Sequence, residues 1–351
     1  MVFYLGLFAI MMIFMLLGRV TMSSIWAWLG VIILALVAGL RYETGNDFLP
    51  YKTIYAGDYS AGQVEPGFLF LRNLFNWIHA PFWLFLLAWA VVTLTLFYFF
   101  AKEYFRPAII PIAYYLSRFF FMRDMGQIRA SLVCVTCMLA LKFVYDEKPL
   151  PFLVIVGLSA TIHVSALFFL LIYPFWLLFR RINFKWVLGF LVFGAAVGFV
   201  APKILSVIIV HTLPRYAPYV TNANYLSSGL FDPVTLMQVM ICITGFYILN
   251  RGMVSNALIG GSEKFKFLMV VYLFATLTLL SLSQLSTIGG RLSTIATTTE
   301  TIVLPTIVFS IMPKKTRTLS MVGVCAVIFV LIFLISGAYK TFIPYQMAFK
   351  V

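Results

Sequence analysis

Charge is what this chain of 351 residues has least of. Only 10% of its residues are charged, with 11 acidic against 25 basic side chains. A soluble domain usually carries about 25% charged residues, and no polar stretch here is long enough to fold as a separate soluble domain. The low charge therefore predicts an all-α, polytopic integral-membrane protein, with residues 1–351 forming one membrane domain.

Cysteine and histidine are also scarce, and their placement argues against redox or metal chemistry. Cys134 and Cys137 have the spacing of a redox motif, but they lie in an apolar stretch without the alternating strands and helices that such a motif accompanies. Cys242 and Cys325 are likewise surrounded by apolar residues. We expect all four thiols to serve packing, and we expect neither a metal site nor a cofactor.

Apolar residues, in contrast, make up 63% of the chain, with a mean hydropathy of +1.02. A helix needs about 20 apolar residues to cross a bilayer. On this basis we predict about twelve transmembrane helices, near residues 2–18, 25–40, 82–100, 107–121, 128–145, 150–162, 164–179, 185–201, 234–250, 266–283, 294–311 and 318–337.

Two segments do not fit a simple span. Residues 66–79 contain Arg72, Asn73 and Asn76, which favour an interfacial or re-entrant helix. Residues 150–179 are thirty largely apolar residues, and a single helix of that length would exceed the hydrocarbon core. We therefore predict a hairpin of two short helices there.

The net charge of +14 comes from basic residues in short loops. Such loops interact with lipid headgroups or anionic substrates, so we expect no nucleic-acid partner. The positive-inside rule places the amino terminus outside and puts the loops near Arg19, Lys102, Arg180 and Lys314 in the cytoplasm. The outer loops are then rich in arginine, whose planar fork binds phosphate in a bidentate manner.

The first of these outer segments is "RYETGNDFLPYK", residues 41–52. Gly45 permits a sharp turn, and Asp47 can pair with Arg41 or with arginines of other loops. Glu65 precedes Pro66, a favourable first residue of a helix. Two interpretations of Glu65 remain: a cap for that helix, or a carboxylate that acts as a general base in a cavity.

The segment "RDMGQIRASL", residues 123–132, is predicted to begin a span. Its spacing would put Arg123 and Gln127 on one face of a helix. Arg129 would lie about one turn deeper, where a charge without a partner is costly. Since the free N–H groups of a helix amino terminus also favour phosphate, the segment predicts an anion site. The alternative is a structural pair with Asp124 or with another carboxylate.

Three further polar residues follow in apolar surroundings. His163 is predicted at the outer tip of the helical hairpin, as a core histidine or as a functional group. Arg291 follows two glycines at a predicted outer helix start, and Glu300 lies about two turns further along that helix. We expect Glu300 to make helix–helix hydrogen bonds with nearby serines and threonines rather than to catalyse a reaction.

The longest polar loop is residues 211–229, where Arg215, Tyr216 and Tyr219 mix cationic, aromatic and hydroxyl groups. These groups suit sugar rings, and they equally suit a membrane-interface belt. Asp232, just before Pro233, is predicted to cap the next helix.

The ordered set of these motifs resembles the EpsG-type branch of bacterial Wzy polysaccharide polymerases. The motifs are Arg41-x3-Gly45-x-Asp47-x3-Tyr51, Glu65-Pro66-Gly67-Phe68, Arg123-x3-Gln127-x-Arg129, His163-x-Ser165-Ala166, Arg215-Tyr216 and Arg291. The resemblance implies a GT-C-like, metal-independent glycosyltransferase of the bacterial cytoplasmic (inner) membrane. It would polymerise undecaprenyl-pyrophosphate-linked oligosaccharide repeats of O-antigen (lipopolysaccharide), capsule or exopolysaccharide, with its active site facing the periplasm or cell exterior.

Under this hypothesis the candidate residues divide into three groups. The pyrophosphate would bind Arg41, Arg123, Gln127, Arg129 and Arg291. The general base would be Asp47, Glu65 or His163, and the glycan would contact Tyr51, Arg215, Tyr216 and Tyr219. Candidate partners are undecaprenyl-pyrophosphate-linked glycans, membrane lipids, a chain-length regulator and a flippase. Two alternatives share part of this chemistry: an O-antigen ligase, and a transporter or flippase of lipid-linked glycans or solutes.

Overall fold

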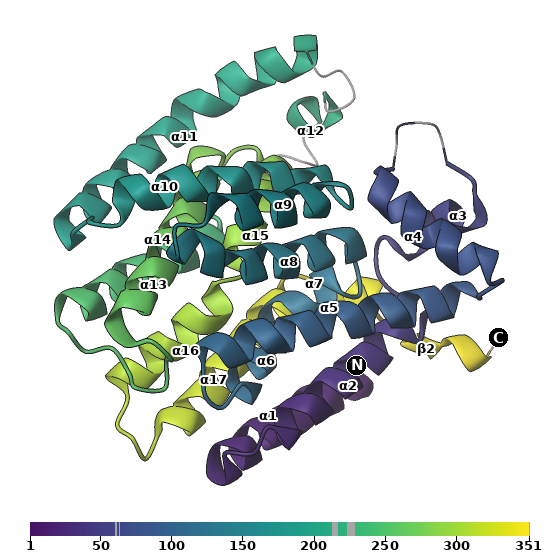
Figure 1. Cartoon of the computed structure of the whole chain (residues 1–351), viewed down its shortest axis with the longest axis horizontal. Coiled ribbons are helices and arrows are strands. Elements are labelled where there is room, and N and C mark those ends of the chain that lie inside the picture. The colour runs from purple at the N-terminus through teal and green to yellow at the C-terminus, as the bar shows by residue number, and fades with distance from the viewer. Residues whose placement is uncertain (60–61, 63, 213–216, 223–228, 351) are drawn as a thin grey trace.

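The computed structural model describes residues 1–59, 62, 64–212, 217–222 and 229–350. The described chain is a bundle of helices, with two strands of two residues each (Figure 1). The predicted arginine and tyrosine at positions 215 and 216 lie outside the described residues.

Seven helices of the described chain are long and apolar enough to cross a membrane. They are α1 (Val2–Thr21), α5 (Phe82–Tyr104), α8 (Ile128–Tyr145), α11 (Phe184–Thr212), α13 (Pro233–Asn250), α14 (Gly261–Ser281) and the helix Arg317–Ile335, which comprises α17 (Arg317–Phe329) and its π-helical continuation. Shorter apolar helices are α2 (Ile25–Gly39), α9 (Pro149–Ala160) and Val164–Phe179, whose second half is α10 (Ile172–Phe179). The chain is thus a helical membrane protein, while twelve spans remain a prediction.

Several local predictions agree with the structure. Residues 66–77 form a short helix, α4 (Pro66–Trp77), with Pro66 as its first residue. The long apolar stretch is divided into α9 and the helix Val164–Phe179, and His163 lies between them. Asp232 caps α13, since its carboxylate accepts hydrogen bonds from the N–H groups of Val234 (2.9 Å) and Thr235 (3.2 Å).

The predicted span 294–311 is wrong as a single helix. It is divided between α15 (Ser286–Thr297) and α16 (Glu300–Ile311), which meet at an angle of 63°. Threonine hydroxyls at the bend bond to nearby carbonyls, Thr298 to Thr294 O (3.1 Å) and Thr299 to Ala296 O (2.7 Å). Such side-chain bonds compete with regular helical geometry. Glu300 therefore begins a new helix and does not continue that of Arg291.

The prediction that Arg123 and Gln127 share one helix face is also wrong. Arg123 ends α7 (Phe121–Arg123), the last part of a continuous helix that begins with α6 (Ile109–Tyr115), and α8 starts only at Ile128. The turn between them is fastened by Asp124, whose carboxylate accepts hydrogen bonds from the hydroxyls of Tyr115 (2.6 Å) and Ser131 (2.9 Å). Residues 124–127 therefore form a turn before α8, whereas Arg123 and Gln127 were predicted within the helix that α8 forms.

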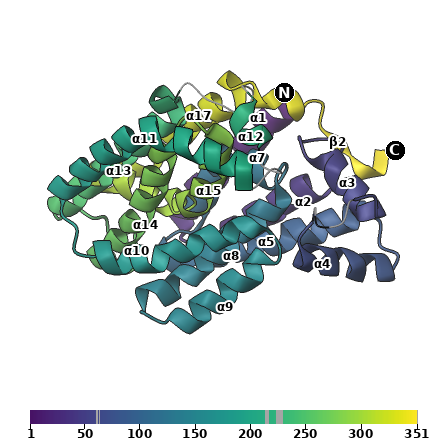
Figure 2. The same cartoon turned by 90° about the horizontal axis from the view of Figure 1, so that it is seen from above.

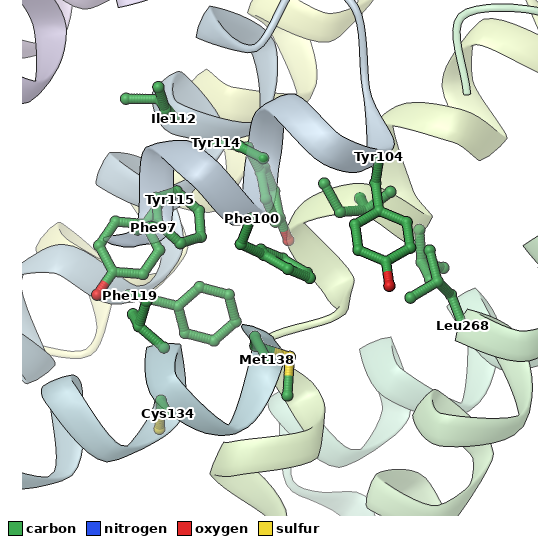
Figure 3. Close-up of a cluster of buried hydrophobic side chains, with 14 of the residues drawn as sticks. Phe97, Phe100, Tyr104, Ile112, Tyr114, Tyr115, Phe119, Cys134, Met138 and Leu268 are labelled. Atoms are coloured by element: carbon green, nitrogen blue, oxygen red, sulfur yellow. The ribbon is translucent and has the colours of Figure 1, made fainter. Parts of the chain in front are cut away.

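Aromatic side chains fill the centre of the bundle, where α5, α6, α8 and α14 meet. Figure 3 shows this cluster, with Phe97 and Phe100 from α5 lying near Tyr115 of α6 and Met138 of α8. Cys134 belongs to the same cluster, and all four cysteines are buried with free thiols. These thiols therefore pack within the protein interior.

A buried ionic group lies beside this core. Glu300 accepts hydrogen bonds from the hydroxyls of Tyr114 (2.5 Å) and Tyr272 (2.8 Å) and from Arg118 Nε (3.1 Å). The expected contact between helices is present, but its partners are tyrosines and an arginine rather than serines and threonines. A buried carboxylate requires such partners, because an unpaired charge in an apolar interior is costly.

The two ends of the bundle differ. The short helices α3 (Phe48–Ala56) and α4 lie together at one end in both views (Figures 1 and 2). Near them, β2 (Gln346–Met347) pairs antiparallel with β1 (Arg41–Tyr42), so the carboxyl-terminal segment returns to the segment that follows α2. The connections from α10 to α11 and from α16 to α17 lie at the opposite end (Figure 1).

Candidate functional site

Two adjoining cavities hold most of the predicted site residues. We call the first the carboxylate cavity; it has a volume of about 240 Å³. Its lining includes eight of the predicted residues: Asp47, Tyr51, Glu65, Gln127, Arg129, His163, Tyr219 and Arg291. We call the second the arginine chamber; it has about 340 Å³ and is lined by Arg118, Arg123 and Arg291, among others. Gln127, Arg291 and Thr294 line both cavities, so the two adjoin along these residues.

Asp47 enters the carboxylate cavity through a tight turn. Gly45 has a φ of +96°, and its N–H donates to Thr341 O (3.0 Å). A side chain at Gly45 would overlap the carbonyl of Met125, so only glycine allows this approach. Among the described residues, the Asp47 carboxylate has no hydrogen-bond partner. Burial raises its pKa, and the nearby Arg291, Arg129 and Arg41 oppose that shift.

Glu65 is fixed by an equally close approach between two helices. The N–H of Gly67 donates to Thr161 O (2.8 Å), and a methyl group at Gly67 would overlap the Thr161 side chain. Glu65 makes no side-chain bond that caps α4. Its carboxylate instead pairs with Arg129 and accepts a hydrogen bond from the N–H of Val164 (3.1 Å). The capping interpretation is therefore not what the structure shows.

Arg129 lies in the first turn of α8. Its guanidinium pairs with Glu65 and lies over the rings of Tyr51 (5.7 Å) and Phe68 (5.5 Å). Its buried Nε has no hydrogen-bond partner among the described residues. Ala130, the next residue, also lines the cavity, so the amino-terminal turn of α8 borders this space. Helix amino termini favour anions because their first N–H groups have no partner within the helix.

His163 is held as a neutral imidazole. Its Nδ1 accepts a hydrogen bond from the N–H of Ser165 (3.2 Å) and lies 3.9 Å from Glu65 Oε1. Burial lowers the pKa of His163, and Glu65 opposes that shift. Since Nδ1 acts as an acceptor, the proton of the neutral ring is on Nε2. The approach to Glu65 is therefore not an ion pair, and Nε2–H remains a donor.

Arg123 is positioned by neutral groups rather than by an acid. Its Nη1 donates to Thr298 Oγ1 (2.8 Å), and its Nη2 donates to the carbonyl and hydroxyl oxygens of Thr294 (both 2.7 Å). The guanidinium also lies 4.0 Å from the ring centre of Phe119. The carboxylate of Asp124 is engaged by Tyr115 and Ser131 instead. Among the described residues, no carboxylate therefore pairs with Arg123 at the wall of the arginine chamber.

Arg291 lies at the junction of the two cavities. Its guanidinium is 4.9 Å from the ring centre of Tyr219, and it makes no hydrogen bond or ion pair with any other described residue. The side chain is exposed. Of the arginines that line the cavities, it is the one most open to a ligand.

A comparison with models of protein families places this chain in a known family. The model of the EpsG family matches residues 24–347, nearly the whole chain. The chain belongs to the EpsG family. Membership in this family indicates a function of the polysaccharide-polymerase type. A search of curated proteins finds no match, and a search of solved structures finds none either.

One predicted residue of this EpsG-family protein lines neither cavity. Arg41 is only 1% exposed, and its Nη1 donates to Ala38 O at the end of α2. Burial lowers its pKa to about 10, although Asp124 opposes the shift. The predicted contact between Arg41 and a pyrophosphate therefore has no support in the cavity geometry.

Other residues that line the cavities were not predicted. Thr294 lines both cavities and holds Arg123, and Gln238 lines the arginine chamber and donates to Thr297 Oγ1 (3.3 Å). The spacing of threonines four residues apart in "STIATTTE" and the single amide in "TLMQVMICIT" were available signals. Within the described residues, no group of three or more His, Cys, Asp or Glu could hold a metal ion.

Proposed function

We propose that this EpsG-family protein is a glycosyltransferase that polymerises oligosaccharide repeat units carried on undecaprenyl pyrophosphate. The reaction would occur at the outer face of the bacterial cytoplasmic membrane. The observation that carries the proposal is the pair of adjoining cavities, in which one set of residues supplies carboxylates and the other supplies arginines. Polymer synthesis from two lipid-linked glycans requires both a base for a hydroxyl and a binding site for a diphosphate.

The diphosphate would lie near Arg123, Gln127 and Arg291. Arg123 is held by Thr294 and Thr298, Gln127 lines both cavities just before α8, and Arg291 is exposed at their junction. Negative charge develops on the diphosphate as its bond to the sugar breaks, and fixed donors at that point stabilise the transition state. In this proposal the arginines provide that stabilisation without a metal ion.

The base would be Asp47. Glu65 already pairs with Arg129, and the Nδ1 of His163 already accepts a hydrogen bond. Asp47 has no such partner among the described residues, and burial raises its pKa, which makes it a stronger base. His163 Nε2–H would instead orient a sugar oxygen.

The bond changes follow from these positions. A hydroxyl oxygen of the new lipid-linked unit forms a bond to the anomeric carbon of the growing chain. The bond from that carbon to the diphosphate oxygen breaks, and the electron pair leaves with undecaprenyl pyrophosphate. The hydroxyl proton passes to Asp47. Tyr51 and Tyr219 line the carboxylate cavity, where their rings could support the acceptor glycan.

Purified protein in lipid nanodiscs, supplied with lipid-linked repeat units, tests the proposal. We expect a ladder of lengthening lipid-linked glycans that persists in EDTA. The proposal would be contradicted if the preparation were inactive although a thermal denaturation measurement showed that the protein is folded. Transfer to lipid A-core without a ladder would support a ligase, and movement of the unit across proteoliposome membranes without lengthening would support a transporter.

A further inference from the structure

An apolar groove runs along the outside of the bundle beside the arginine chamber. Its larger part has a volume of about 860 Å³ and lies between α13 and α17, with Leu304 and Ile307 of α16 forming its floor. A second part of about 350 Å³ continues it toward Ser320 and shares Val324, Val327 and Ile328 with the first. The two parts therefore form one groove.

The groove meets the arginine chamber at one end. Val234, in the first turn of α13, lines both spaces. Asp232 is the only ionisable residue among the described ones that line the groove, and it lies at this same end. Its carboxylate is occupied by the amino terminus of α13. Away from the chamber, the residues that line the groove are almost all apolar. The groove therefore suits a ligand that is apolar along most of its length and anionic only at the end near the arginines.

The length of the groove suits a single extended chain. Along the helix that begins with α17, it reaches from Ser320 to Ser336, which is roughly 24 Å at a rise of about 1.5 Å per residue. The hydrocarbon core of a bilayer is about 30 Å thick. The groove is open on its outer side, where Met240 is 68% exposed and Val327 58% exposed. A chain could therefore enter sideways from the membrane.

We propose that this groove binds the polyprenyl chain of the donor, with its diphosphate in the arginine chamber. The inference rests on the proposed function, because that function supplies a ligand with an anionic head and a long isoprenoid chain. It adds a specific site: the donor lipid lies between α13 and α17. The carboxylate cavity is then left for the acceptor.

Photo-crosslinking tests this site with a C55 polyprenyl diphosphate that carries a diazirine near the end of its chain. In nanodiscs we expect adducts on α13 and α17, and unlabelled C55 polyprenyl diphosphate should compete with them. C55 polyprenol and phosphatidylglycerol should compete poorly, since they lack the diphosphate. Adducts spread over all lipid-facing helices, or groove adducts that phosphatidylglycerol removes equally well, would overturn the proposal.

A matched pair of substitutions on α17 provides the second measurement. Val327→Trp fills the groove, whereas Leu319→Trp adds the same ring at a position that is 67% exposed and outside the groove. We expect Val327→Trp to weaken binding of C55 polyprenyl diphosphate by about tenfold or more, because the indole ring displaces the chain from its packing contacts with the groove walls. Leu319→Trp should bind normally, and equal binding by both variants would refute the groove.

These results separate this inference from the function itself. A ladder of lengthening glycans with unchanged binding in Val327→Trp would refute the groove and leave the polymerase standing. Binding that depends on the groove, without any ladder, would refute the polymerase and leave a polyprenyl-diphosphate site. If Val327→Trp fails to fold, the crosslinking pattern of the wild-type protein still tests whether the chain lies in the groove.

Discussion

Replacement of Arg291 by alanine separates catalysis from stability more cleanly than any other change at this site. The side chain is exposed, it makes no hydrogen bond or ion pair with another described residue, and its guanidinium lies 4.9 Å from the ring centre of Tyr219. A cation–π contact at an exposed position contributes about 0.5–1 kcal/mol. Arg291→Ala should therefore lower the free energy of unfolding by no more than about 1 kcal/mol.

The expected effect on the reaction is much larger. Removal of one donor to a developing oxyanion typically costs about 2.7–4 kcal/mol, which corresponds to about 10²–10³ in rate. Arg291→Lys keeps the charge but loses the planar fork that binds two phosphate oxygens. We expect its rate to lie between those of the wild-type protein and Arg291→Ala.

The assay is the initial rate of glycan lengthening in nanodiscs, measured beside thermal unfolding. Arg251→Ala is the matched control, because Arg251 is also exposed and lies over a tyrosine, Tyr247, at 5.4 Å. Arg251 follows the end of α13 and lines neither cavity. If Arg291→Ala is folded and lengthens glycans as fast as Arg251→Ala, the assignment of Arg291 to the diphosphate is refuted.

Two further predictions concern the carboxylates. Asp47→Asn should lower kcat by a factor of about 10²–10⁴. The rate of the wild-type protein should rise with pH as Asp47 loses its proton, because burial raises the pKa of this carboxyl group. A similar rise with pH in Asp47→Asn would exclude Asp47 as the source of the pH dependence. Gly67→Ala should push the start of α4 away from Thr161 and displace Glu65 from Arg129. We expect a loss of about 1–3 kcal/mol in stability and of about 10²-fold in rate, and normal values of both by thermal unfolding and the lengthening assay would contradict this close-approach role.

Local signals in the sequence were enough to predict many elements. The apolar run that became α8 was predicted at 128–145, and the structure has Ile128–Tyr145. Pro66 begins α4 and Asp232 caps α13, as expected. These features depend on residues within one or two turns of each other, through apolar length and helix capping. A single sequence therefore contains the information that determines them.

The features that could not be predicted depend on distant partners. The turn after Arg123 is held by contacts of Asp124 with side chains on two helices, and Glu300 meets Tyr114 across 186 positions of the chain. The pairing of Glu65 with Arg129 spans 64 positions. Nothing in a single sequence selects these partners from the other acids and bases.

The same reasoning applies to the arginines of the site. Their position at one predicted membrane face indicated an anion site, since arginine there opposes the positive-inside preference. The sequence could not distinguish their states, which the structure shows to differ: Arg129 pairs with a carboxylate, Arg123 is held by threonines, and Arg291 is exposed. Arg41 is buried and lines neither cavity. Residue type predicted the kind of chemistry, while tertiary packing determines which side chain can perform it.

The balance of charge in the carboxylate cavity suggests how the two halves of the proposed reaction are linked. The carboxyl groups of Asp47 and Glu65 line this cavity together with the guanidinium groups of Arg129 and Arg291, and His163 is neutral. In the proposed reaction Asp47 would accept the hydroxyl proton, and one positive charge would then lose its counterpart. Negative charge reaches the leaving diphosphate at the same stage, next to Arg291. Proton transfer would thus strengthen the attraction for the leaving group, because charges interact strongly in a partly buried site. An arginine with a permanent carboxylate partner could not respond in this way.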